Sequence, residues 1–315
     1  MIVHHFGLTF SPTEAAQARE RQSTPELAEA WSAFESLLGQ TAPDPLRQAV
    51  VDAVSWRLTG DAAAAARAAA VLAGDAIRTN DSDLPLIDGC RRAIGFAQAF
   101  ECVRDHQSMS DLARASIIDY WHERVSALND RLVQPAIHER AWLAAVNLAA
   151  GVVLDREPVF TTGADSLQRI VDSIQPHGYI GAIVEPRDEG TLTRTVSAVH
   201  GLVLAAEIAA QAGVDLWAYE RRGVSVMTAA LYPLYYFYYP EKWPWFDGLQ
   251  PDLVKAQFRE HAAFLEMVNR KNGGTVRAVK LILDEVRPVY DAWGGGPVSL
   301  THAVVPVARR GLFRR

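Results

Sequence analysis

The sequence predicts an all-α protein, and three observations lead to that class. Apolar residues recur at helical spacing over most of the 315 residues. The periodic segments are separated by short turns rich in Gly, Pro and Asp, which end one helix and start the next. Strand-like alternation is confined to one stretch, HGYIGAIVE at residues 177–185. We therefore expect a helical fold with at most a short β-hairpin at that stretch.

Start and stop signals mark several of the expected helices. Thr24 is placed to cap a helix whose first position is Pro25, and Gly39 follows its last apolar residue. Asp61 and Ser110 stand in the same capping position before two later segments. The expected helical segments are, in order, 24–39, 44–60, 61–74, 86–106, 110–133, 135–155, 163–174, 195–213, 215–239, 251–270 and 275–293.

The connections between these segments predict how the helices are arranged. Short turns favour antiparallel pairs of successive helices. Pairs stacked around a common axis form an incomplete (α/α) toroid, with a groove lined by the inner helices and by loops at one end. No linker or low-complexity segment divides the chain, and no fixed-period repeat indicates a solenoid. We therefore expect a single domain over residues 1–315.

Composition excludes several classes of partner. The net charge of -6 argues against a nucleic-acid-binding face. No uninterrupted apolar run reaches the roughly 18 residues that span a bilayer, so no membrane partner is expected. The start, MIVHHFGLTFSPTE, lacks the features of a signal peptide, which predicts a cytoplasmic protein. Cys90 and Cys102 are interpreted as core residues. No cofactor or metal motif is present, so none is expected, and the oligomeric state stays open.

The order of five segments resembles the alginate lyase family and related uronate polysaccharide lyases with an incomplete α/α toroid. The segments, which are distributed over nearly the whole chain, are residues 6–22, 56–72, 137–155, 183–217 and 285–300. The resemblance implies the toroid fold and an activity on uronic-acid-containing oligosaccharides by β-elimination. An acidic oligosaccharide is therefore the expected partner.

The resemblance also shows where this chain departs from the family. With Trp142 as the anchor, the family's neutralising Asn falls on His138 and its catalytic His on Glu139. With the Ala206–Glu207 pair as the anchor, the family's Arg falls on Arg187 and is retained. The catalytic Tyr falls on Arg194, and the following His becomes Thr195. The scaffold is thus kept while the catalytic set is altered.

A uronate lyase neutralises the sugar carboxylate, removes the adjacent proton and protonates the leaving oxygen. We assign these roles to three candidates. Arg187 grips the carboxylate in a bidentate manner, or is a surface arginine paired with a neighbouring acid. His138 donates to the carboxylate or acts as base, or is an ordinary histidine at a helix start. Tyr179 replaces the missing tyrosine, or is a packing aromatic in a turn.

Further residues are candidates for contacts with the sugar. They are charged groups near the family positions, one histidine in an apolar helix, and aromatic residues suited to stacking on a sugar ring. Each has a structural alternative: a first-turn charge, a surface charge, a core histidine or a core aromatic. The candidates are Glu139, Arg140, Trp142, Glu185, Arg194, His200, Tyr235 and Trp243.

Three functions are compatible with these residues. The first is β-elimination on an acidic oligosaccharide. The second is a non-catalytic descendant that binds a carbohydrate or a protein, favoured by loss of the Tyr–His pair. The third is an enzyme that uses the groove for another acidic small molecule. Tyr179 within reach of His138 and Arg187 would favour the first function.

Overall fold

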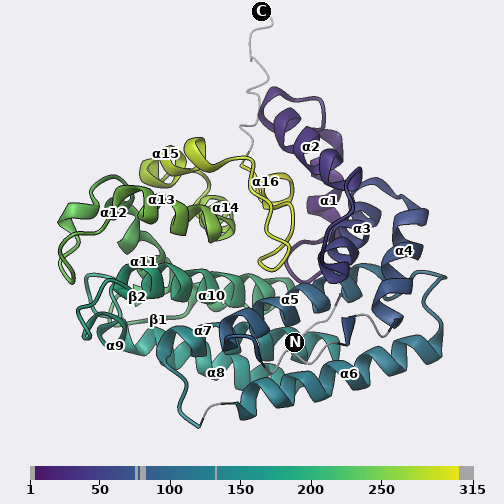
Figure 1. Cartoon of the computed structure of the whole chain (residues 1–315), viewed down its shortest axis with the longest axis horizontal. Coiled ribbons are helices and arrows are strands. Elements are labelled where there is room, and N and C mark those ends of the chain that lie inside the picture. The colour runs from purple at the N-terminus through teal and green to yellow at the C-terminus, as the bar shows by residue number, and fades with distance from the viewer. Residues whose placement is uncertain (1–3, 75–76, 79–82, 132, 305–315) are drawn as a thin grey trace, which may run out of the picture.

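The computed structural model describes residues 4–74, 77–78, 83–131 and 133–304, and the described chain is mostly helical (Figure 1). Two short strands, β1 (Glu220–Arg221) and β2 (Val224–Ser225), form one antiparallel pair in this part of the chain. The predicted all-α class is confirmed. The prediction of one domain over residues 1–315 includes residues outside the described part, and it stays a prediction.

The helices follow one another with short connections. The α-helices are α1 (Pro12–Glu20), α2 (Pro25–Leu38), α3 (Pro45–Thr59), α4 (Ala62–Ala73), α5 (Leu86–Val103), α6 (Asp111–Asp130), α7 (Ile137–Val153), α8 (Glu157–Ser173), α9 (Gly181–Val184), α10 (Thr191–Gln211), α11 (Val226–Leu231), α12 (Tyr235–Tyr238), α13 (Pro251–Glu260), α14 (Ala263–Lys271), α15 (Arg277–Val286) and α16 (Val298–Thr301). The 3-10 helices are η3 (Leu216–Ala218), η4 (Tyr232–Leu234) and η5 (Pro240–Lys242).

Local signals explain where several helices begin. The Ser11 hydroxyl accepts a hydrogen bond from the Glu14 amide at 3.4 Å, and the Glu14 carboxylate accepts one from the Ser11 amide at 2.7 Å, which forms a capping box at α1. Asp61 caps α4 as predicted. Thr24 makes no capping hydrogen bond, because its hydroxyl donates to a preceding backbone carbonyl at 2.8 Å. Pro25 still marks the first position of α2.

The helices α3, α5, α7, α10 and α14 run in the same direction and form the inner layer of the toroid. Each neighbouring pair is joined by two contacts that follow one another in the same order along both helices. Helices α3 and α5 are joined by Asp44–Arg92 and Arg57–Glu101, and α5 and α7 by Arg91–Trp142 and Arg104–Val153. Helices α7 and α10 are joined by Trp142–Ser197 and by Val152 and Ile208, which line one small cavity. Helices α10 and α14 are joined by His200–His261 and Glu207–Arg270.

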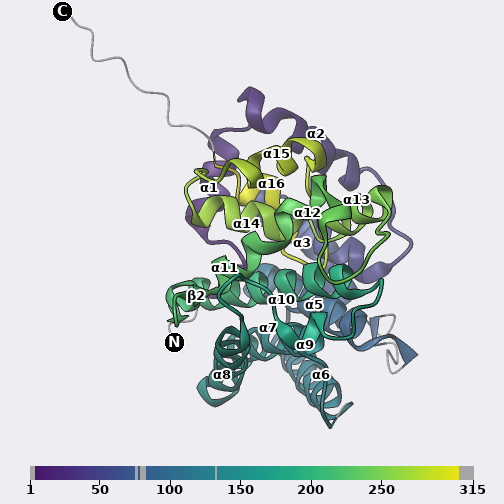
Figure 2. The same ribbon diagram turned by 90° about the vertical axis from the view of Figure 1, so that its left-hand side faces the viewer.

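The helices α4, α6 and α8 form the outer layer. They pack against the inner helices α3, α5 and α7. In Figures 1 and 2, α6 and α8 lie beyond α7, on the outside of the molecule. The close fit of α8 on α7 depends on Gly163, because a Cβ there would lie 2.7 Å from the backbone nitrogen of Leu148. Alternation of inner and outer helices is the predicted α/α toroid, which is confirmed.

Segments from both ends of the described chain pack together and close the ring. Helix α16 contacts α1 and α2, and Figure 2 shows these helices gathered with α14 and α15. The Thr9 hydroxyl donates to the Gly295 carbonyl at 3.4 Å. Residues 287–297, between α15 and α16, form a segment that we call the closing loop. In Figure 1 this yellow loop extends toward α5 and α10, at the centre of the molecule.

The short hairpin lies elsewhere than predicted. Residues 177–185 contribute only one bridge residue, Ile180, which pairs with Ile174, and then continue as α9. The hairpin is instead the β1–β2 pair, where Gly223 has a φ of 76° at the turn. A left-handed backbone of this kind suits glycine, which has no Cβ to clash.

Two long helices predicted in the second half are interrupted. The segment 215–239 is divided into η3, the β1–β2 hairpin, α11, η4 and α12. Pro233 lies within this run and cannot supply an amide to continue an α-helix. The segment 251–270 is divided into α13 and α14 at His261 and Ala262. This interruption carries the His261 side chain into the core.

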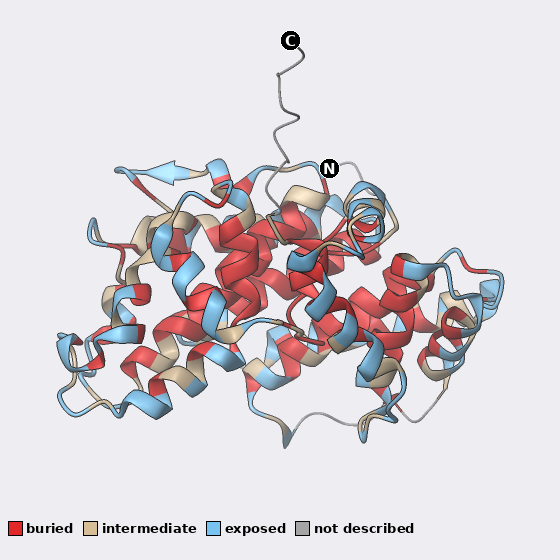
Figure 3. Ribbon diagram, turned by 90° about the horizontal axis from the view of Figure 1, so that it is seen from above, coloured by how far each residue is buried: buried red, intermediate tan, exposed pale blue. Residues whose placement is uncertain are grey.

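Buried residues run through the central helices, whereas exposed residues lie at the rim (Figure 3). The helix α10 is apolar along most of its length. By length and composition alone, its 21 residues could cross a bilayer, although the sequence has no uninterrupted apolar run of that length. In the structure, 89% of its most apolar window is buried inside the protein. The position of α10 is therefore that of a central core helix.

Candidate functional site

Polar side chains collect where the inner helices begin. Because these helices run parallel, their N-terminal ends lie at one end of the toroid. Arg91 and Arg92 lie in the second turn of α5, His138 in the first turn of α7, and Arg194 in the first turn of α10. The partial positive charge of helix N-termini favours a negative ligand at this end.

A pocket of about 600 Å³ opens beside the starts of α3 and α5. We call it the Arg91 pocket. Three arginines, two aspartates and a tryptophan give its lining a net formal charge of +1 and one aromatic face. The residues are Asp44, Arg47, Leu84, Asp88, Arg91, Arg92 and Trp293. Guanidinium groups bind carboxylates through two parallel hydrogen bonds, and an indole ring offers a face to a sugar.

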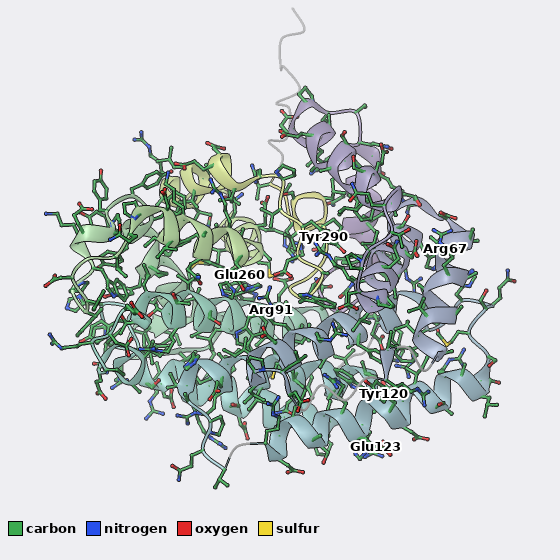
Figure 4. All side chains as sticks on the ribbon, in the orientation of Figure 1. Arg67, Arg91, Tyr120, Glu123, Glu260 and Tyr290 are labelled. Atoms are coloured by element: carbon green, nitrogen blue, oxygen red, sulfur yellow. The ribbon has the colours of Figure 1, made fainter. Side chains whose placement is uncertain are left out.

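Two carboxylates hold Arg91 in this pocket. Its Nη1 lies 3.0 Å from Glu260 Oε1, and its Nη2 lies 3.4 Å from Asp291 Oδ2. The guanidinium carbon lies 5.7 Å from the ring centre of Trp142. Figure 4 shows Arg91, Glu260 and Tyr290 near the middle of the molecule, whereas Arg67 lies at its flank. The Arg91 guanidinium is thus fixed at the inner wall of the pocket.

The closing loop places Trp293 in the same pocket. The Trp293 amide donates to Asp291 Oδ1 at 2.9 Å. Its indole packs on α5 at Gly95, where a Cβ would lie 2.4 Å from the ring. The guanidinium of Arg92 lies 5.5 Å from the ring centre, within the range of a cation–π contact. The absence of a side chain at Gly95 therefore allows the Trp293 ring to approach α5 closely.

A buried pair of histidines lies behind Arg91. The Nδ1 atoms of His200 and His261 are 3.1 Å apart, so one imidazole donates to the other. Burial lowers the pKa of both well below the ordinary value, and the positive charge of Arg91 lowers both further. His200 Nε2 is buried without a hydrogen-bond partner among the described residues and lies 3.9 Å from Asp291 Oδ2. Both imidazoles are therefore uncharged at neutral pH.

A second cluster lies in and around the turn between α9 and α10. The Tyr179 ring packs on Trp245 with 4.9 Å between centroids, and the Arg187 guanidinium carbon lies 5.5 Å from the Trp245 ring centre. Trp245 in turn donates to the Tyr232 hydroxyl at 2.9 Å. Tyr179 and Arg187, both predicted catalytic residues, therefore share one aromatic partner. Arg187 is exposed and has a positive φ of 50°.

Arg194 and His138 are brought near each other at the starts of α10 and α7. Arg194 Nη2 lies 2.7 Å from Asp188 Oδ1, and Arg194 also lines a second pocket of about 530 Å³ with residues of α13. Burial lowers the pKa of the half-buried His138, Glu139 raises it, and the charge of Arg194 lowers it. His138 is therefore uncharged at neutral pH and can accept a proton.

Comparisons with known proteins identify the fold. No family model and no curated protein matches the sequence. An alginate lyase from Bacteroides ovatus is similar in structure, with a TM-score of 0.70, 11% identity, and coverage of 95% of this chain and 99% of that one. Alginate lyase A1-III from Sphingomonas species A1 has a TM-score of 0.68 and 16% identity, with coverage of 82% and 75%. The chain has an alginate-lyase-like fold.

A variant of alginate lyase A1-III solved with a tetrasaccharide gives the same result, with a TM-score of 0.68 and 16% identity over 84% of this chain and 76% of that one. The family resemblance stated from the order of segments is therefore confirmed at the level of fold. At these identities the alginate-lyase-like fold is what the structures share.

Several predicted site residues are buried inside this alginate-lyase-like fold. Trp142 is fully buried, and its indole donates to the Ser197 hydroxyl at 3.0 Å. Trp243 is 2% exposed and donates to the Thr191 hydroxyl at 2.8 Å. His200 is fully buried against His261. These positions are corrections to the predicted sugar contacts, because side chains with almost no exposed surface cannot touch a ligand.

Other predicted contacts are accounted for by local structure or lie on the surface. Glu139 accepts from the Ala136 amide at 2.7 Å and so caps α7, which is the first-turn role given as its structural alternative. Arg140 and Glu185 are exposed. Tyr235 is 52% exposed, and its ring stacks on that of Tyr239 at 4.8 Å.

The residues that form the Arg91 pocket were not among the predicted site residues. Arg91 and Arg92 occur as an adjacent pair within an otherwise apolar helix, which was the available signal. Asp291 and Trp293 belong to the segment 275–293, which was predicted as a helix, whereas α15 ends at Val286 and the closing loop follows it. Among the residues that the structure describes, no group of three or more His, Cys, Asp or Glu side chains is placed to hold a metal ion.

Proposed function

We propose that this chain binds a uronic-acid-containing oligosaccharide at the N-terminal end of its inner helices and cleaves it by β-elimination. The observation that supports the proposal is the Arg91 pocket. It combines Arg47, Arg91 and Arg92 with the aromatic face of Trp293, inside an alginate-lyase-like fold. This combination is suited to a sugar ring that carries a carboxylate.

The chemistry requires three groups. Arginines stabilise the negative charge that grows on the carboxylate when the adjacent proton is removed. An uncharged base takes this proton, and we assign the role to His138, because its pKa is lowered. The bond from C4 of the uronate to the linking oxygen then breaks, a double bond forms, and the oxygen is protonated. We assign that last step to Tyr179, next to Arg187.

One observation favours a binding protein without catalysis as the second candidate. Arg194 lies where the family resemblance puts the catalytic tyrosine, and its guanidinium is paired with Asp188 at 2.7 Å. An arginine does not give up a proton at neutral pH. In addition, Tyr179 packs on Trp245. A chain with these features can retain uronate binding after losing elimination.

One experiment separates the two candidates. Purified protein is mixed with mannuronate, guluronate and glucuronate oligosaccharides, and the absorbance of the unsaturated product and the heat of binding are both measured. We expect absorbance that is lost in His138→Gln and Tyr179→Phe, with binding weakened in Arg47→Ala. The control is Arg67→Ala, on the flank of the molecule (Figure 4). Binding without absorbance supports the second candidate. The absence of both binding and absorbance contradicts both candidates.

A further inference from the structure

Asp291 links the two groups of the Arg91 pocket that suit a uronate. One carboxylate oxygen, Oδ2, lies 3.4 Å from Arg91 Nη2, and the other, Oδ1, accepts from the Trp293 amide at 2.9 Å. The backbone of Asp291 also pairs with that of Gly296, which fixes the carboxylate within the closing loop. A single buried side chain thus sets the position of a cation and of an aromatic ring.

We infer that Asp291 is a positioning residue that makes the Arg91 pocket prefer a uronate over its neutral ester. The inference rests on the proposed function for the identity of the ligand. Asp291 does not touch the ligand. It orients the Arg91 guanidinium toward the pocket and holds the Trp293 ring at a fixed place beside it, so that carboxylate and sugar face are recognised together.

The surroundings of Asp291 direct its charge to Arg91. His200 Nε2 lies 3.9 Å away, and burial lowers the pKa of His200 well below its ordinary value, so the imidazole side of Asp291 carries no positive charge at neutral pH. Glu260 faces the other nitrogen of Arg91 from the end of α13. Gly294 leaves room for this arrangement, because a Cβ there would lie 2.5 Å from Asp291 Oδ2. Arg91 is therefore the cation that balances Asp291.

Charge alone predicts the opposite effect of removing the Asp291 carboxylate. The lining of the Arg91 pocket has a formal charge of +1, and adding Asp291 and Glu260 behind it makes the total -1. Neutralising either carboxylate would strengthen anion binding if charge were decisive. The positioning role predicts weaker binding for Asp291→Asn, because the amide has one acceptor oxygen for two donors, Arg91 Nη2 and the Trp293 N–H, so one of them loses its partner. The two explanations therefore differ in sign.

The test measures calorimetric binding of a mannuronate trimer and of its methyl ester to the full chain. For Asp291→Asn we expect the Kd of the trimer to rise about tenfold and that of the ester to stay within about twofold. Glu260→Gln is expected to bind the trimer at least as tightly as the unmodified chain. Asp52→Asn, which removes the charge of a buried carboxylate paired with the exposed Arg67 outside the pocket, controls for loss of an ion pair. Unchanged or tighter trimer binding by Asp291→Asn overturns the inference.

A second variant and a measurement without ligand complete the design. Asp291→Glu keeps the charge but moves it by one methylene. The positioning role therefore predicts weaker trimer binding, whereas charge alone predicts unchanged trimer binding. If the unmodified chain binds no uronate, the proposed function fails. The rate at which phenylglyoxal labels Arg91 then tests whether Asp291 positions this arginine. We expect Arg91 to be labelled several-fold faster in Asp291→Asn than in Asp52→Asn. Equal labelling rates, read by mass spectrometry, overturn the inference.

Discussion

The Nδ1 atoms of His200 and His261 lie 3.1 Å apart in the core of the toroid, where both imidazoles are buried. Burial lowers the pKa of each well below the ordinary value. In the unfolded chain both would titrate near 6.5. The unfolded state therefore binds more protons than the native state as the pH falls below that value.

We expect the free energy of unfolding to decrease at acidic pH for this reason. Each buried histidine contributes a slope of up to about 1.4 kcal/mol per pH unit below about 6.5. His200→Phe removes one of these contributions. Urea unfolding at several pH values between about 7 and 5 should show a shallower loss of stability in the variant. Parallel curves for the two proteins would contradict the assignment.

The comparison with the variant is needed because other groups titrate in the same range. The hydrogen bond to Glu101 raises the pKa of His5, so its contribution to stability is present below 6.5 and is lost as the pH rises through the raised pKa. Burial raises the pKa of the Glu207 carboxyl, which opposes the histidine effect. These groups are unchanged in His200→Phe, so their contributions cancel in the difference.

The packing of α8 on α7 gives a second prediction. A Cβ at Gly163 would lie 2.7 Å from Leu148 N and 2.9 Å from Ala144 O, and backbone atoms of a packed helix cannot easily move away. We expect Gly163→Ala to reduce the free energy of unfolding by about 1–3 kcal/mol. Gly181→Ala is the matched control, because its nearest neighbour is a flexible carboxylate at 3.6 Å. Equal melting temperatures for the two variants would contradict the prediction.

The two cysteines are expected to be unreactive in the folded protein. Burial raises the pKa of the Cys90 and Cys102 thiols to about 12, which leaves almost no thiolate at neutral pH. A colorimetric thiol reagent should therefore detect neither cysteine in the native chain and both in denaturant. Rapid reaction of a native thiol would show that the core opens locally near α5.

Arg187 is expected to matter for binding and little for stability. Its guanidinium is exposed and contacts the Trp245 ring, an interaction that contributes about 1 kcal/mol or less at the surface. Arg187→Ala should therefore fold normally and lose several-fold in affinity for a uronate oligosaccharide, as measured by calorimetry. Arg169→Ala, an exposed arginine on the outer helix α8, is the control. Equal affinities of the two variants for the uronate oligosaccharide would show that Arg187 takes no part in binding.

The fold was more predictable than the site, for a physical reason. Helix periodicity and caps are local, so helices such as α4, between Asp61 and Gly74, can be located from neighbouring residues. The break near Pro233 has a local cause that was overlooked, whereas the break at His261 goes with the packing of its side chain on His200 of α10. The segment 177–185 alternates like a strand, but no partner strand lies beside it beyond one bridge.

The site depends on contacts across the chain. Arg91 and Asp291 are 200 positions apart and meet only because the closing loop enters the centre of the toroid. No spacing rule in one sequence joins these residues. The family resemblance placed Arg187 and Arg194 near the start of α10, where a 530 Å³ pocket lies, but it said nothing about Arg91. Trp142 and His200 were selected for chemical type, and burial decides their role.

The closure of the ring by α16 has a consequence for biosynthesis. A ribosome releases α1 and α2 before it has made most of the chain, yet Phe34 on α2 packs near Tyr290 of the closing loop. The apolar faces of the first helices therefore remain exposed until almost 300 residues have been synthesised. Contacts of such long sequence separation form late and leave the growing chain open to misassociation. Nascent chains that stall before α16 should be preferred clients of chaperones that bind exposed apolar helices.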